Sequence, residues 1–93
     1  MTKQGTWGEI RRLRQTANYN FGSRKVGVMN VWREKAGTMV AQLAIFDPAT
    51  RKGEELRVRV DDEFAVGEDR YCVVQIVSAQ GNDFAYLEVV PTD

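Results

Sequence analysis

Hydrophobic and polar positions alternate along much of the chain in short segments, as they do in half-buried β-strands. The clearest case is ELRVRV at residues 55–60, where Leu56, Val58 and Val60 share one face and the arginines between them share the other. No segment shows the longer period of an amphipathic helix over several turns. Other strand-like segments are rich in β-branched and aromatic residues: KVGVMNVW, TMVAQLAIF, RYCVVQIVS and DFAYLEVV.

Glycines punctuate these segments at intervals of 14–16 residues, each beside other turn-forming residues. Glycine adopts the positive φ angles of tight turns without steric cost, so the spacing predicts a succession of hairpins. Asp47 and Pro48 suit the first two positions of a type I turn and predict a hairpin there. The glycines in question are Gly22, Gly37, Gly53, Gly67 and Gly81.

The segment RYCVVQIVS is apolar on both of its faces, which predicts a central strand or one covered on both sides. Strict alternation would put Cys72, Val74 and Ile76 on one face. The other face would carry Tyr71, Val73 and Val77, with Gln75 interrupting the pattern. Cys72 is therefore expected to be buried and unreactive.

The first twenty residues allow two interpretations. Thr6 and Glu9 have the spacing of a helix capping box, and apolar residues follow at intervals of three. Gly8 and the segment TANYNF favour extended chain instead, so we favour a strand over residues 9–20. The whole pattern predicts an all-β domain of residues 1–93, with residues 1–8 as a loose N-terminus. Five or six strands would form an antiparallel meander folded into a small barrel or a two-layer sandwich.

Composition limits the chemistry. The 93 residues are 43% hydrophobic and 28% charged, which is typical of a folded domain. The chain has no histidine and a single cysteine, so it cannot use histidine chemistry, an internal disulfide or a cysteine-rich zinc site. We expect a non-enzyme with no cofactor. The N-terminal residues lack the apolar stretch of a secretory signal and no segment could span a membrane, so a cytoplasmic location is expected.

Charge is distributed unevenly although its sum is zero. Residues 1–36 carry eight basic and two acidic groups, whereas the remainder carries five basic and eleven acidic groups. Such a division is typical of a basic arm for an anionic partner, or of N-terminal strands that lie beside acidic C-terminal strands. We favour the second explanation.

Acidic residues cluster where the ELRVRV strand ends and the next turn begins. Metal binding by hard cations needs a loop of defined spacing, which the chain lacks. The acids are instead expected to be solvated turn residues, and Phe64 and Val66 between them are expected to point inward. The cluster consists of Asp61, Asp62, Glu63, Glu68 and Asp69.

Basic and aromatic residues interleave in the N-terminal third, as they do in proteins that hold single-stranded nucleic acid. The overall charge of zero and the pI near 6.3 argue against a dedicated nucleic-acid binder. Trp32, with Met29 and Met39, fits either the core or an exposed binding surface. The candidate binding surface therefore comprises Arg11, Arg12, Arg14, Tyr19, Phe21, Arg24, Lys25 and Trp32.

Three segments, EIRRLRQ, RKVGVMNV and LRVRVDDEFAVGEDRYCVVQI, resemble the layout of an uncharacterised family of small β-rich actinobacterial proteins. Asp61 and Asp62 stand where that pattern has Gly-Asp, so the turn geometry would differ. The resemblance implies the β fold and no activity.

The function expected from these observations is a non-catalytic protein-interaction module that binds another protein or a second copy of itself. The alternatives are a small barrel that binds single-stranded nucleic acid through the basic N-terminal strand, and a small-molecule-binding barrel. The last would require an internal pocket of a few hundred Å³, roughly the size of known ligand sites, with Glu88 or Gln75 pointing inward.

Overall fold

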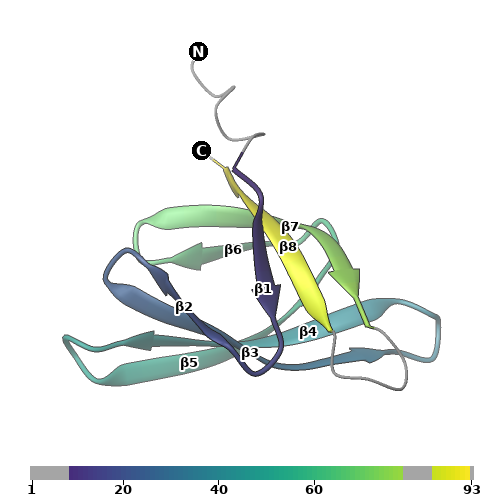
Figure 1. Ribbon diagram of the computed structural model, residues 1–93, viewed down its shortest axis with the longest axis horizontal. Coiled ribbons are helices and arrows are strands. Elements are labelled where there is room, and N and C mark those ends of the chain that lie inside the picture. Colours follow the sequence, from purple (N-terminus) through teal and green to yellow (C-terminus); the bar gives the residue numbers. More distant parts are fainter. Residues whose placement is uncertain (1–8, 79–84, 93) are drawn as a thin grey trace, which may run out of the picture.

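Eight antiparallel β-strands and no helix make up the residues that the computed structural model describes, which are 9–78 and 85–92 (Figure 1). The all-β prediction is confirmed, but the predicted five or six strands were too few. Two extra strands arise. The expected strand over residues 9–20 is divided by a corner, and residues 63–66 form a separate strand that pairs with residues 69–72. The strands are β1 (Arg11–Arg14), β2 (Asn18–Phe21), β3 (Arg24–Arg33), β4 (Met39–Asp47), β5 (Lys52–Arg59), β6 (Glu63–Val66), β7 (Asp69–Val77) and β8 (Tyr86–Thr92).

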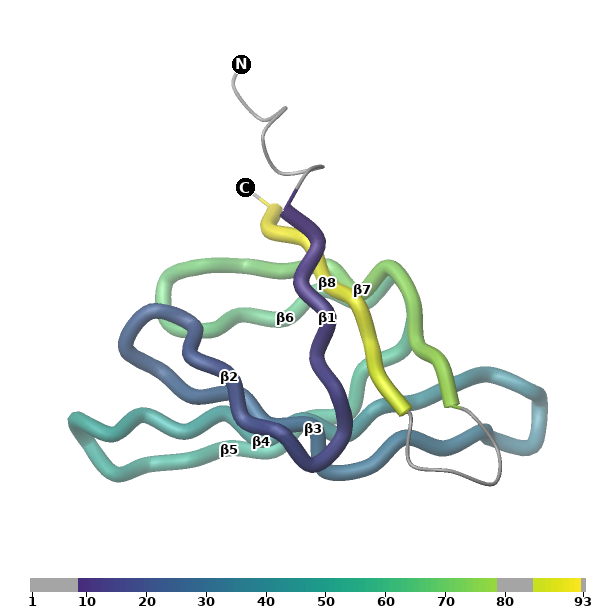
Figure 2. The backbone as a smooth tube through the Cα atoms, viewed as in Figure 1, coloured from purple at the N-terminus to yellow at the C-terminus, as the bar shows by residue number. Residues whose placement is uncertain are grey.

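The strands form two four-stranded sheets that are not closed into a barrel. The first sheet has the order β1-β8-β7-β6 and the second the order β2-β3-β4-β5. Within each sheet, strands adjacent in sequence pair as in a meander, except that β1 joins the last strand, β8. β1 and β2, and β5 and β6, follow each other in sequence but lie in different sheets. Figure 2 shows the consequence: the described chain begins and ends side by side at the same end of the molecule.

The chain passes from the first sheet to the second at a corner between β1 and β2. Gln15 donates its backbone N–H to Ala85 O (2.9 Å) in the first sheet, and Thr16 donates to Val28 O (3.1 Å) in the second. Thr16 has a φ of 70°, which turns the backbone sharply between these two bonds. The strand predicted over residues 9–20 is thus confirmed at 11–14 and 18–20, which lie in β1 and β2. Thr6 and Gly8 lie outside the described residues.

A single hydrophobic cluster lies between the sheets, and both sheets contribute to it. Burying one Leu or Val side chain contributes about 1.5–3 kcal/mol, so these positions dominate the stability of the fold. The largest fully buried side chains in the cluster are Leu13, Val73, Leu87 and Val89 from the first sheet, and Val26, Leu43 and Val58 from the second (Val58 2% exposed, the others 0%).

A β-bulge in β7 shows that the strict alternation predicted for RYCVVQIVS was wrong. The register shifts between Val73 and Gln75, so Val74 is the extra residue. An inserted residue moves every later side chain to the opposite face. Val73 and Ile76 therefore share the core, whereas Val74 and Cys72 are half-buried on the outer face. The prediction that β7 is a central strand is confirmed.

The alternation of ELRVRV holds for two of its three apolar positions. Val58 is buried and Leu56 packs partly buried against the core, but Val60 is 43% exposed. Val60 was predicted to face inward and does not, because β5 ends at Arg59 and the next residue but one, Asp61, turns the chain with a φ of 77°. Phe64 and Val66, in β6, are buried as predicted.

Three of the five marked glycines, Gly22, Gly37 and Gly67, lie in turns with positive φ, as predicted. Gly53 lies inside β5 instead, and Gly81 lies outside the described residues. The β4–β5 reversal falls earlier, at residues 48–51. There the predicted hairpin at Asp47 is confirmed: Asp47 accepts from Ala49 N through Oδ1 (3.0 Å) and from Arg51 N through its carbonyl (2.8 Å).

Candidate interaction surface

The eight candidate surface residues do not form one patch. The strands that carry them belong to both sheets, and alternation places their side chains on different faces. Arg12 and Arg14 lie on the outer face of the first sheet, and Lys25 and Trp32 on the outer face of the second. The other four lie elsewhere. Tyr19 lies at the corner between β1 and β2, Phe21 lies in the core with Arg11 over its ring, and Arg24 lies beside the turns.

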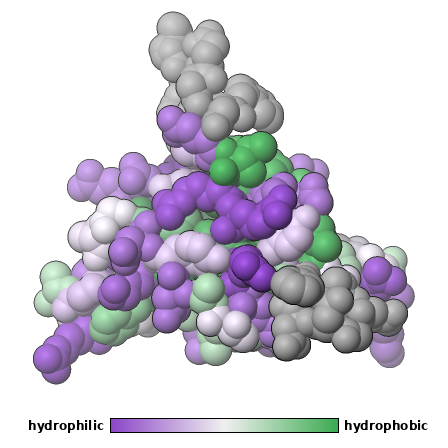
Figure 3. Space-filling view, in the orientation of Figure 1, coloured by the Kyte–Doolittle hydropathy of each residue, from purple (hydrophilic) through white to green (hydrophobic). Residues whose placement is uncertain are grey.

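On the outer face of the first sheet, Arg12 in β1 forms an ion pair with Glu88 in β8 (2.9 Å) and lies 4.3 Å from the centre of the Tyr86 ring. The hydrogen bond to Glu88 raises the pKa of Arg12. Arg12 and Glu88 are direct neighbours in the β1–β8 register. The favoured explanation of the charge division, basic strands beside acidic ones, thus holds for this pair. Figure 3 shows a mainly hydrophilic surface on this side of the molecule.

Arg11 covers an aromatic group at one end of the core. Its guanidinium lies 3.8 Å from the centre of the Phe21 ring and donates to Asn20 O (3.0 Å). Phe21 is 5% exposed and packs edge-on against Tyr71, with ring centroids 5.0 Å apart. Burial, followed by the charge of Asp69, raises the pKa of Tyr71. Phe21 therefore stabilises the core and presents no face on which a nucleic-acid base could stack.

Tyr19 holds the corner between β1 and β2. Its hydroxyl accepts a hydrogen bond from the backbone N–H of Arg14 (2.9 Å), and its ring packs against the core. The contact ties the two sheets together where the chain changes from one to the other. Tyr19 thus has a structural role that the sequence pattern did not reveal.

Arg24 joins three turns. It forms an ion pair with Asp47 at the start of the β4–β5 turn (3.3 Å), and it lies against Gly67 of the β6–β7 turn. Arg24 itself follows the β2–β3 turn. A surface hollow of 390 Å³ lies between the β2–β3 and β6–β7 turns, and Glu68 and Asp69 line it together with Arg24. This mixture of charges favours neither an anion nor a cation.

Trp32 lies on the outer face of the second sheet, where Arg57 approaches it to 5.8 Å from the ring centre. Trp32 is half-buried, and beside it Val40 is fully buried although it is not part of the cluster between the sheets.

Met29 was a candidate for the core but is 47% exposed, because the register of β3 shifts there. The shift lies between Val28 and Asn30 and makes Met29 the extra residue of a β-bulge. Lys25, at the start of β3, donates from Nζ to Asn20 Oδ1 (3.4 Å).

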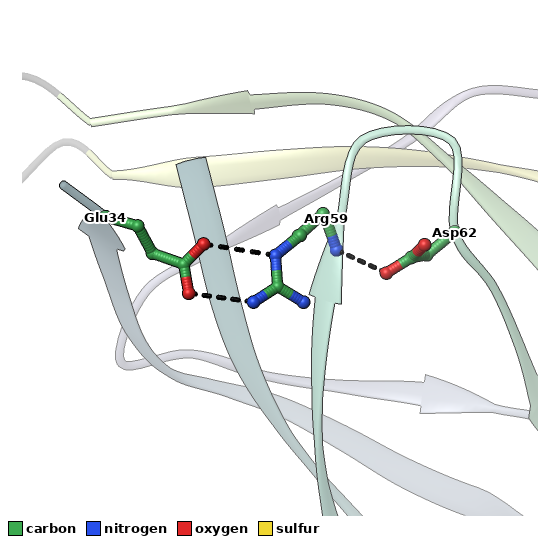
Figure 4. A network of polar contacts seen from close by, with 3 residues as sticks. All are labelled: Glu34, Arg59 and Asp62. Carbon is green, nitrogen blue, oxygen red and sulfur yellow. Dashed lines mark hydrogen bonds and ion pairs between the residues drawn. The ribbon is translucent and has the colours of Figure 1, made fainter. Parts of the chain in front are cut away.

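The acidic cluster after β5 is engaged in local polar contacts. Asp62 Oδ2 accepts from the backbone N–H of Arg59 (2.8 Å), and Glu63 pairs with Arg70 (3.1 Å). Figure 4 shows that Arg59 also forms a two-pronged contact with Glu34, with distances of 3.2 and 2.8 Å. The hydrogen bond from Arg59 lowers the pKa of Glu34, and the same bond raises the pKa of Arg59. All five acids of the cluster are exposed, as expected for solvated turn residues.

Potential reactive and metal-binding groups are few. Within residues 9–78 and 85–92, no three Cys, Asp or Glu side chains are placed so as to hold a metal ion. Cys72 is half-buried rather than buried. Burial is the main cause that raises the pKa of its thiol, and the nearby acids Asp61, Glu63 and Asp62 add to the effect. The thiol is therefore mainly protonated at neutral pH.

Three hollows on the described surface, of 350, 390 and 480 Å³, open to the outside. The polar groups expected to point into an internal pocket do not do so: Gln75 is exposed and Glu88 pairs with Arg12. Among the described residues, no helix has the length and apolar character needed to cross a membrane.

The sequence pattern did not identify one feature, the free edge of β5. This strand is eight residues long and ends the second sheet, whereas the other sheet-end strands, β1, β2 and β6, each have four residues. Leu56 and Val58 are partly or fully buried, and the other six residues of β5 are exposed. Within the part of the chain that the structure describes, Lys52, Glu54, Glu55 and Arg57 have no ion-pair partner. Glu55 accepts only from Gln42 Nε2 (3.1 Å).

No family model, no curated protein and no solved structure matches this chain. The resemblance to the actinobacterial family therefore stays a prediction, and any functional argument depends on the geometry described above.

Proposed function

We propose that this domain is a two-layer β-sandwich that acts as a non-catalytic protein-interaction module, and that it associates through the edge of β5. The observation that supports this most directly is the length and exposure of that edge. The sandwich is favoured over a barrel because the two sheets share one core while their ends stay unjoined.

An edge strand has backbone N–H and C=O groups that face outward without a neighbouring strand. A partner that adds a strand there satisfies these groups, and alternate side chains provide specificity. β2 pairs only with the first four residues of β3, Arg24–Gly27, whereas β5 presents its edge along all eight of its residues.

The rest of the described surface gives less support to the alternatives. The three hollows described above are open, and no polar or charged residue is buried as a whole among the described ones, which is unlike the converging polar groups of most ligand sites. The basic and aromatic residues of the N-terminal third lie on different faces, and several already contact acids or the core. This distribution does not favour a nucleic-acid platform.

Size-exclusion chromatography with light scattering, at low and high salt, tests self-association. We expect a mass above that of the 10.6 kDa chain at high concentration and low salt, and a lower mass when salt screens the charges on β5. A monomer at high concentration in low salt would remove the version in which the partner is a second copy.

Hydrogen exchange on the associated form tests the location. Backbone amides of β5 should gain protection on association, whereas those of β6, the shorter edge strand of the other sheet, should not. Protection gained elsewhere while β5 stays unchanged would contradict the proposal.

A further inference from the structure

We infer that the strand added to this edge is β5 of a second copy, paired antiparallel about a two-fold axis at Leu56. The inference rests on the proposed function and specifies the partner and the register. The resulting assembly would join the two β2-β3-β4-β5 sheets into one continuous sheet.

Symmetry restricts how two identical edges can pair. In a two-fold antiparallel pair the axis stands perpendicular to the sheet, and one residue lies opposite its own copy. Residues equally far before and after that residue then lie opposite each other and point to the same face. Each choice of central residue thus fixes every other contact along β5.

With Leu56 at the axis, the charges of β5 are complementary. Glu55 lies opposite Arg57 of the second copy, and by symmetry Arg57 lies opposite Glu55 of the second copy. Gly53 faces Arg59, and Glu54 faces Val58, so no like charges are directly opposed. Opposite charges that face each other across strands stabilise the pair, and like charges in the same positions destabilise it.

The neighbouring registers are less favourable. An axis at Glu54 or Glu55 places that glutamate opposite itself, and an axis at Arg57 does the same with the arginine. An axis at Val58 places Arg57 opposite Arg59 twice. An axis at Gly53 avoids like charges but pairs only three residues of the strand, since β5 begins at Lys52.

Packing agrees with this register. Leu56 is partly buried against the core at the border of the second sheet, so one side of it stays accessible. A second Leu56 directly opposite would cover that side on both copies. On the outer face, Glu55 contacts Gln42 of β4 and Arg57 lies near Trp32 of β3, on the side of β5 away from its free edge. Both side chains are exposed, so they can turn toward the second strand when it pairs.

Charge exchange between the two positions tests the register. Glu55→Arg and Arg57→Glu, each alone, create like charges in both symmetric pairs and should raise the dimer dissociation constant about tenfold or more. The double variant Glu55→Arg/Arg57→Glu restores opposite charges and should restore dimer formation. Sedimentation velocity and light scattering give the dissociation constants, and circular dichroism checks that each variant is folded.

Mixing the two single variants provides a sharper test. Each is weakened alone, but together they place opposite charges in both pairs and should form a heterodimer, which native mass spectrometry detects. The matched control is Glu68→Arg, in the exposed β6–β7 turn, which makes the same charge change far from β5. It should dimerise like the original chain, and with Arg57→Glu it should form a weaker heterodimer than Glu55→Arg does, because only one of the two pairs then has opposite charges.

A cysteine at the axis tests the geometry independently of charge. In a Cys72→Ser background, Leu56→Cys should form an intermolecular disulfide under mild oxidation, because only the axial residue meets its own copy. Glu54→Cys should not cross-link, since it would face Val58. A dimer that forms equally well in both single charge variants, or cross-links equally at both cysteines, overturns the register but leaves the interaction module intact. A monomer at high concentration and low salt overturns self-association itself.

Discussion

Gly22 and Gly67 have almost the same backbone conformation but different surroundings. Their φ angles are +63° and +65°. Nothing lies within 4 Å of a side chain added at Gly22, whereas a Cβ at Gly67 would lie 2.7 Å from Arg24 Nη1. The two positions therefore separate the cost of a left-handed backbone from the cost of displacing Arg24.

We expect Gly22→Ala to lower the free energy of unfolding by about 1 kcal/mol, the usual cost of a left-handed alanine. Gly67→Ala should cost more, because Arg24 must also leave its contact with Asp47. Chemical denaturation gives both values. In an Arg24→Ala background the two glycine substitutions should lower the free energy of unfolding by the same amount. If Gly67→Ala still cost more than Gly22→Ala in that background, Arg24 would not be the cause.

Glu34 gives a pH-dependent contribution to stability. Its pKa in the folded chain lies below the ordinary value of 4.5 because Arg59 donates hydrogen bonds to it. Its stabilising effect is therefore complete above pH 4.5, where the carboxyl is ionised in both states. The stabilisation is lost as the pH falls below 4.5 and then below the lowered pKa of Glu34 in the folded chain, because the carboxyl becomes protonated in both states.

Thermal unfolding from pH 7 to about pH 3 tests this dependence. Glu34→Gln should melt at a lower temperature than the original chain at neutral pH, and the difference should shrink in acid. Lys35→Gln, a charge change in the same turn without an ion-pair partner among the described residues, should not reproduce that trend. A difference that stays constant with pH would argue against the Glu34–Arg59 contact.

At the scale of the strand, the bulges decide which side chains enter the core. Alternation predicted the inward faces of β5 and β6 at Leu56, Val58, Phe64 and Val66, because these strands contain no extra residue. It failed in β7, where Val74 is inserted and reverses the order after it. Apolar residues on both faces of this strand leave no polar position from which a sequence pattern could detect the shift.

Lysine substitutions on either side of this insertion test the assignment. Val73→Lys places a charge in the core and should destabilise the chain by several kcal/mol, about 3 or more, or prevent folding. Val74→Lys lies on the half-exposed outer face and should cost about 1 kcal/mol or less. Denaturant unfolding compares the two variants. The reverse ranking would restore the strict alternation and contradict the bulge.

At the scale of the whole molecule, the opposite charges of the two halves of the chain are interleaved. Arg12 meets Glu88, Arg24 meets Asp47, and Glu34 meets Arg59, each across strands or turns. Two arginines of the basic N-terminal third, Arg12 and Arg24, thus have their charge paired with acids from the rest of the chain. Nucleic-acid affinity depends on uncompensated positive charge, and pairing of this kind reduces it.

A gel-shift series with single-stranded DNA tests this consequence. We expect no retardation of the DNA by micromolar protein even at low salt. Binding that weakens steeply with added salt, and that is lost in an Arg11→Gln/Arg12→Gln variant, would instead support the nucleic-acid alternative.

Local sequence patterns were enough to predict the secondary structure class and most of the turns. These depend on local properties: period-two alternation, β-branched residues, the positive φ that glycine permits, and the turn chemistry of Asp47 and Pro48. The strand order, the pairing of β1 with β8, and the position of β5 at a sheet edge were instead seen only once the chain was folded. Those features depend on contacts between residues far apart in the chain, and a sequence pattern along one strand contains no information about which strand lies beside it.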